Sequence, residues 1–223
     1  MLTARIRSRV SRLSSVHWAG IIACTIESAV IEYRAMSSAF IPTRTRISTD
    51  RYQMMVATGV LTKYDRIELI EGDMLDMAPI GTKHSAITSR LHELFVLAVS
   101  RSATVVSGGP VNLGEFSQPQ PDLMLLKRRA DFYSGKAPEA ADVLLLIEVS
   151  DGSLAFDQSV KLNLYARYGV AEYWVVDVEG KRIVTYREPT AKGYIRKTEL
   201  EPPDDVTPHA FPDVKIAVGG IFG

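Results

Sequence analysis

Residues 121–166 decide how this chain folds. They read PDLMLLKRRADFYSGKAPEAADVLLLIEVSDGSLAFDQSVKLNLYA. Two unbroken apolar runs, 123–126 and 143–147, are too short for typical helices and are typical of strands buried on both faces. If the two strands pair in antiparallel fashion, Asp122 and Glu148 come together at one end of the sheet.

The segment after the second run returns to that same end. The Asp-Gly-Ser turn signal at 151–153 reverses the chain, so the helix that begins near Phe156 starts beside the two acids. Asp157 and Lys161 are four residues apart and share a helix face. We therefore expect three carboxylates and one ammonium to meet, although each feature alone is also common among solvated surface charges.

Such a constellation suits metal-assisted phosphodiester hydrolysis. Carboxylate oxygens bind hard cations, and a magnesium site combines one or two carboxylates with water and substrate phosphate. A nearby lysine can position or help deprotonate the attacking water and can stabilise charge on the phosphate. The expected cofactor is Mg²⁺ or Mn²⁺.

Periodicity predicts the other elements. Helices are expected over 49–58 and 84–100, a hairpin with a Glu-Gly-Asp bend over 66–77, and strands over 171–177 and 181–187. Two further expectations concern single residues. Gly219 and Gly220 argue against a helix at the end of the chain, and His92 is not expected on the helix face of His84, which argues against a metal-binding histidine pair.

Short motifs also follow one another in a characteristic order. They are ELIEGD at 68–73, His84 at a helix start, QPD at 120–122, EVS at 148–150 and YARYGVAEYWVVD at 165–177. In this order they resemble the Uma2-like (DUF820) branch of the PD-(D/E)xK nucleases, over roughly residues 45–200. Most of that superfamily has a lysine two residues after the second acid, where this chain has Ser150, and the resemblance implies that Lys161 on the next helix replaces it.

The resemblance implies a fold and a set of site residues. The fold is α/β (α+β), a restriction-endonuclease-like core with a central mixed β-sheet flanked by helices and an added N-terminal β-hairpin. The implied residues are the metal ligands Asp122, Glu148 and the Val149 carbonyl, the catalytic Lys161, and Asp157 and Glu71 as further candidates.

Three of the candidate residues keep an ordinary alternative. Glu71 is either another carboxylate of the metal site or a turn residue in water. His84 either contacts phosphate or water, or caps its helix. Tyr165 either leans toward the substrate or packs in the core, because it lies one helical turn after Lys161.

Charge and cysteine content restrict the partners. The chain has 26 Lys and Arg residues and 26 Asp and Glu residues, so its formal net charge is zero. Proteins that bind DNA non-specifically are usually basic, so this balance argues against non-specific DNA binding. A single cysteine fits a reducing cytoplasm. No GxxxxGK[ST] or GxGxxG motif occurs, so no nucleotide cofactor is expected.

Residues 1–35 differ from the rest of the chain. Four arginines precede the first acid, and the partly apolar stretch 16–31 is interrupted by Glu27 and too short to span a bilayer. A secretory signal is one interpretation. We favour a spurious or disordered extension, with the natural start at Met36. We expect a non-family extension over 1–35 and a single Uma2-like nuclease domain over 36–223.

Three functions follow from these patterns. The first is a metal-dependent endonuclease acting on DNA, for which symmetric cleavage of a duplex would require a homodimer. The second is a catalytically inactive nucleic-acid-binding or regulatory protein of the same fold, favoured by Ser150 and by the neutral charge. The third is hydrolysis of a small phosphodiester, which needs no basic patch.

Overall fold

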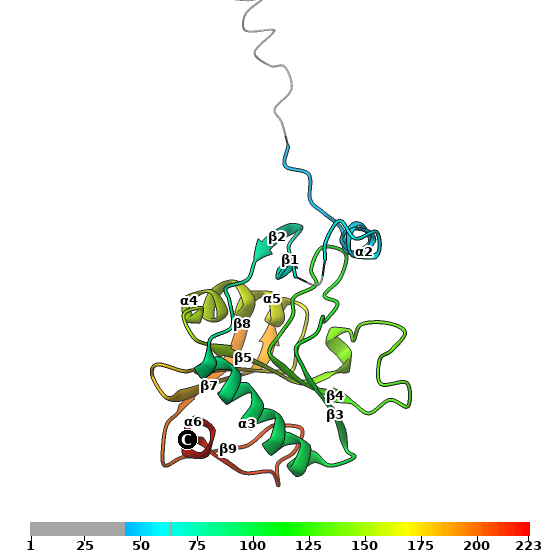
Figure 1. Ribbon diagram of the computed structural model, residues 1–223. Coiled ribbons are helices and arrows are strands. Elements are labelled where there is room, and N and C mark those ends of the chain that lie inside the picture. The colour runs from blue at the N-terminus through cyan, green and yellow to red at the C-terminus, as the bar shows by residue number, and fades with distance from the viewer. Residues whose placement is uncertain (1–42, 63) are drawn as a thin grey trace, which may run out of the picture. The chain divides into compact units, whose positions relative to one another are not determined.

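A six-stranded mixed β-sheet is the centre of the structure, a computed structural model that describes residues 43–62 and 64–223 (Figure 1). The chain divides into two units, residues 1–44 and 45–223, and the sheet belongs to the second. Only the β5–β6 pair is parallel among the sheet's neighbouring strands. In spatial order the strands are β3 (Ala103–Ser107), β4 (Leu123–Lys127), β5 (Val143–Ser150), β6 (Glu172–Asp177), β7 (Arg182–Thr190) and β8 (Gly193–Leu200).

The two strands that carry the predicted acids pair as expected. β4 and β5 are antiparallel, with Leu123 opposite Ile147, and the register shifts between Leu125 and Leu126. Asp122 immediately precedes β4, and Glu148 lies one residue beyond Ile147, the last residue of β5 that pairs with β4. The antiparallel register therefore confirms that both acids lie at the same end of the sheet.

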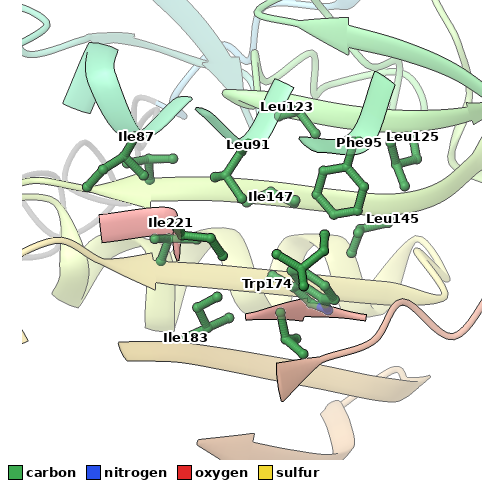
Figure 2. Packing of buried hydrophobic residues seen from close by; sticks show 14 of the residues in the cluster. Ile87, Leu91, Phe95, Leu123, Leu125, Leu145, Ile147, Trp174, Ile183 and Ile221 are labelled. Carbon is green, nitrogen blue, oxygen red and sulfur yellow. The ribbon is translucent and has the colours of Figure 1, made fainter. Parts of the chain in front are cut away.

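Helix α3 (Thr82–Val99) covers one face of the sheet. Its Ile87, Leu91 and Phe95 pack on side chains that alternate along β4, β5 and β6 (Figure 2). The C-terminal segment completes this layer with β9 (Asp205–Val206), β10 (Ile216–Ala217) and α6 (Val218–Phe222). The predicted helix over 84–100 is thus present and begins two residues earlier.

The other face is covered by a hairpin and a second helical segment. The hairpin consists of β1 (Ile67–Ile70) and β2 (Asp73–Asp76). The helical segment consists of α4 (Leu154–Phe156), the π-helical turn η2 (Asp157–Lys161) and α5 (Leu162–Arg167). Because both faces are covered, the central strands are apolar on both sides, which explains their unbroken apolar runs.

The hairpin turns through two residues with positive φ. Ile70 pairs with Asp73, and Glu71 and Gly72 between them have φ angles of 53° and 87°. Two positive φ angles are typical of the type I′ turn, whose twist matches the strands that it joins. Ahead of the hairpin, α2 (Thr49–Ala57) is capped by the Ser48 hydroxyl.

Two expectations about single residues are wrong. The chain ends in the short helix α6 despite Gly219 and Gly220, because Val218 and Ile221 are buried in the core under α3 and tertiary packing overrides helix propensity. The expectation that His84 and His92 lie on different faces of α3 is also wrong, because both residues line the same surface hollow.

Among the described residues no helix is long and apolar enough to cross a bilayer. The expected extension over 1–35 lies outside the described residues.

Candidate active site

Lys161 lies between two carboxylates from different parts of the fold. Its Nζ is 3.0 Å from Glu148 Oε1 on β5 and 3.2 Å from Glu68 Oε2 on β1. The lysine side chain is 2% exposed. Glu68 is held from the other side by the Gln120 backbone N–H, 2.8 Å from its Oε1. The structure thus brings the predicted Lys161–Glu148 pair together and adds Glu68.

Burial controls the ionisation of these groups. Removal from water raises the pKa of Glu148 well above its ordinary value and raises that of Glu68, although the nearby Lys161 ammonium opposes both shifts. Burial alone would lower the pKa of Lys161. The Glu148 and Glu68 carboxylates outweigh that effect and raise the pKa of Lys161 above its ordinary value, so the side chain stays protonated.

Asp122 is oriented by two donors at the end of the sheet. The Val149 backbone N–H donates to Oδ2 over 2.8 Å, and His84 Nε2 lies 3.0 Å from Oδ1. The hydrogen bond to Asp122 raises the pKa of His84. The Val149 backbone therefore lies next to Asp122, and a metal-ligand role for its carbonyl stays a prediction.

The wide η2 turn supports the same cluster. Asp157 at its start is buried and accepts hydrogen bonds from Ser150 Oγ over 2.7 Å and Ser153 Oγ over 2.5 Å. Asp157 thereby fixes the turn between β5 and the helix, and its charge favours the protonated form of Lys161. Single π-helical turns are frequent at functional sites.

Tyr165 lies behind the cluster. Its hydroxyl donates to Glu148 Oε1 over 2.6 Å, and the ring is fully buried. Tyr165 does not line the cavity in front of the acids. Tyr165 thus packs in the core, as one of the two alternatives held, while its hydroxyl orients Glu148. The expected contact with a substrate does not fit this position, because Tyr165 is absent from the cavity wall.

A cavity of about 490 Å³ opens in front of these groups. Asp122, Glu148, Lys161 and Asp157 line it together with His84 and Val149. Six predicted site residues therefore share this wall: Asp122, Glu148, Val149, Lys161, Asp157 and His84.

The cluster suits a divalent cation by its charge and its donors. Within residues 43–62 and 64–223, no group of three His, Cys, Asp or Glu side chains is arranged to hold a metal. However, Mg²⁺ needs only one or two carboxylates beside water and substrate, and none of the described residues donates a hydrogen bond to Glu148 Oε2. The cavity wall is also rich in acids. Asp76, Asp122, Glu148, Asp151 and Asp157 line it, together with the cations Arg66 and Lys161 and with His84.

Glu71 is not brought to the cluster, whereas Glu68 of the same ELIEGD motif is. Glu71 lies at the exposed hairpin bend and pairs with Arg167 over 2.5 Å. Glu68 was not among the predicted site residues, although the sequence contains a signal for it. Glu68 points to the same strand face as the buried Ile70, and a carboxylate buried on such a face requires a cationic partner.

Comparisons with known proteins agree with this fold. A family model described as "Uma2: Putative restriction endonuclease" matches residues 56–219. The crystal structure of "a putative nuclease belonging to DUF820" from Anabaena variabilis ATCC 29413 superposes with a TM-score of 0.61 at 18% identity, covering 79% of this chain and 97% of that one. A comparison with curated proteins gave no match.

Proposed function

The chain belongs to the Uma2 family, and on that premise we propose that it is a metal-dependent endonuclease that hydrolyses DNA phosphodiester bonds. One observation carries the proposal. Lys161 Nζ, distant in sequence from Asp122, lies 3.0 Å from the carboxylate of Glu148 in the wall of a cavity that Asp122 also lines. Carboxylates that can hold a metal ion and an ammonium that can stabilise negative charge, placed together at a cavity, suit phosphodiester hydrolysis.

Each side chain of the cluster has a distinct role in this proposal. Asp122, Glu148 and the Val149 carbonyl would hold the ion, which when bound supplies Lewis-acid stabilisation of negative charge on the phosphate. His84 keeps Asp122 oriented through the contact at Oδ1, and Tyr165 does the same for Glu148 at Oε1. These contacts leave the carboxylates little rotational freedom, so the ligands are preorganised.

Lys161 acts as a cation in this scheme. Its ion pairs with Glu148 and Glu68 favour the protonated form and raise its pKa, so Lys161 donates hydrogen bonds. Its ammonium can orient the attacking water and stabilise charge that develops on the phosphate. Glu68 limits the movement of Nζ and is a positioning residue, since it does not line the cavity.

Plasmid nicking tests the proposal. Purified protein with Mg²⁺ or Mn²⁺ should convert supercoiled plasmid to the open-circular form, and Asp122→Asn should reduce the rate at least a hundredfold. Glu199→Gln is the matched control, because Glu199 is an exposed carboxylate on β8 outside the cavity. Equal rates for wild type and Asp122→Asn would refute the assignment.

A second candidate is a binding protein that has this fold without the chemistry. Ser150 favours it, because the residue at the usual lysine position is buried and donates its hydroxyl to Asp157. Calorimetric titration with Mn²⁺ separates the two candidates. A catalytic centre should bind Mn²⁺ at least tenfold more tightly in the wild type than in Glu148→Gln, whereas equal affinities would favour the inactive binding protein.

A further inference from the structure

A second hollow continues from the candidate active site along α3. Its volume is about 530 Å³, and it shares Ile80, His84 and Asp122 with the first cavity. The rest of its wall is formed by hydroxyl residues, histidine and glycine, with no acid, lysine or arginine. That part consists of Ser85, Thr88, Ser89, His92, Ser107 and Gly108.

Hydrogen-bonding groups in this wall are left without partners. His84 Nδ1 and Thr88 Oγ1 are buried, and neither has a hydrogen-bond partner among the described residues. His92 Nδ1 is 2.6 Å from Ser107 Oγ, which leaves the second ring nitrogen of His92 for another contact. Buried polar groups without partners cost free energy, so a bound ligand that satisfied them would be favoured.

The spacing of these residues suits an extended ligand. His84, Thr88 and His92 follow one another at four-residue intervals along α3. Eight residues of helix rise about 12 Å, which is longer than one phosphate group. A ligand that contacted all three residues would therefore extend from the cavity at Asp122 toward Ser107.

The chemistry of the wall points to phosphodiester oxygens. Hydroxyl and imidazole N–H groups donate hydrogen bonds, and side chains of this kind commonly contact phosphates in nucleic-acid complexes. Asp122 is the one carboxylate in this wall, at the end next to the active site. A cation would find no further acid in the hollow, and an apolar ligand would leave the donors unsatisfied.

We propose that this hollow binds the nucleic-acid backbone next to the scissile bond, with Thr88 and His92 contacting phosphate oxygens. The inference rests on the proposed nuclease function and extends it. It assigns a direction to the substrate strand, along α3 and away from the acids. It also explains how a chain without net charge holds DNA, through hydrogen bonds from uncharged side chains in place of a basic surface.

Imidazole NMR of the full chain without divalent metal tests this directly. An oligothymidylate octamer should shift the His84 and His92 signals saturably. His209 is an internal control, because it lies outside the hollow, next to β6, where its backbone N–H binds Glu172. Thymidine and inorganic phosphate are the comparison ligands. An affinity for thymidine equal to that for the octamer would indicate recognition of the base. An affinity for inorganic phosphate equal to that for the octamer would indicate a site for free anions. Either result would overturn the inference.

Thr88→Val removes one hydroxyl without changing side-chain shape. It should weaken octamer binding about tenfold, the effect of losing one hydrogen bond to a charged group. Thr198→Val, the same change at an exposed position of β8, should leave the affinity unchanged. Equal affinities for the two variants would overturn the role of Thr88.

Octamer binding and plasmid nicking can fail separately. If the protein nicks plasmid while the His92 signal does not move, the hollow is not the track and the nuclease proposal stands. If the His92 signal shifts without nicking under any metal, the hollow binds nucleic acid and the catalytic proposal fails. If neither occurs, both are refuted.

Discussion

The Lys161 ammonium is shared by two buried carboxylates, and this arrangement makes the stability of the protein depend unequally on the three residues. Lys161→Met leaves Glu68 and Glu148 buried without a cation, which should cost about 3–5 kcal/mol of unfolding free energy. Glu68→Gln leaves the Lys161–Glu148 ion pair, in which one positive charge faces one negative charge. Because burial already raises the pKa of Glu68, a neutral side chain there should cost about 1 kcal/mol or less.

Urea denaturation of both variants measures this difference. Lys197→Met is the control for removing a lysine, since Lys197 is exposed and its pair with Glu199 contributes little. Similar losses for Lys161→Met and Glu68→Gln would show that the ammonium is not the group that makes burial of the two acids tolerable.

At the scale of elements, the β1–β2 hairpin carries Glu68 to the site, and its turn depends on Gly72. A side chain at this residue would meet two obstacles. Its φ is positive, and an added Cβ would lie 2.5 Å from Arg46 Cβ. Gly72→Ala should therefore cost about 2 kcal/mol or more, since φ strain alone accounts for about 1–2 kcal/mol.

Gly59→Ala is the matched control in thermal unfolding. Gly59 also has a positive φ, of 76°, but an added Cβ would meet nothing within 4 Å. We expect Gly72→Ala to lower the midpoint more than Gly59→Ala. The reverse order would mean that the close approach of Arg46 does not constrain the hairpin.

At the scale of the whole described unit, one sheet separates two apolar cores. Phe95 packs on the α3 face and Leu164 on the α5 face, and both side chains are fully buried. Because the same strands form one wall of each core, Phe95→Ala and Leu164→Ala should lower one common unfolding transition, by about 3–5 and 2–5 kcal/mol.

Denaturant unfolding followed by both tryptophan fluorescence and far-UV circular dichroism checks the common transition. Leu97→Ala, at a position of α3 that is 75% exposed, should change stability by about 0.5 kcal/mol or less. Transitions that separate in one variant but not in the other would show that the two cores unfold independently.

Local sequence determined most of the elements and one end of the site. Apolar runs too short for typical helices indicated strands covered on both faces, and the turn signal at 151–153 placed the start of the next helix beside the acids. The order of motifs likewise predicted the mixed sheet and the family, both of which are confirmed. The Asp122–Glu148 end of the sheet followed because antiparallel pairing of neighbouring strands is a local rule.

Only the tertiary structure decided which residue of ELIEGD reaches Lys161, that Tyr165 lies behind Glu148, and that His84 and His92 share a hollow. Hydrophobic periodicity shows which face of an element is buried, but not which distant element covers it. Glu68 and Lys161 are separated by 93 positions, and their contact depends on how the hairpin docks on the sheet. That docking depends on side-chain packing across the whole unit, which no short pattern encodes.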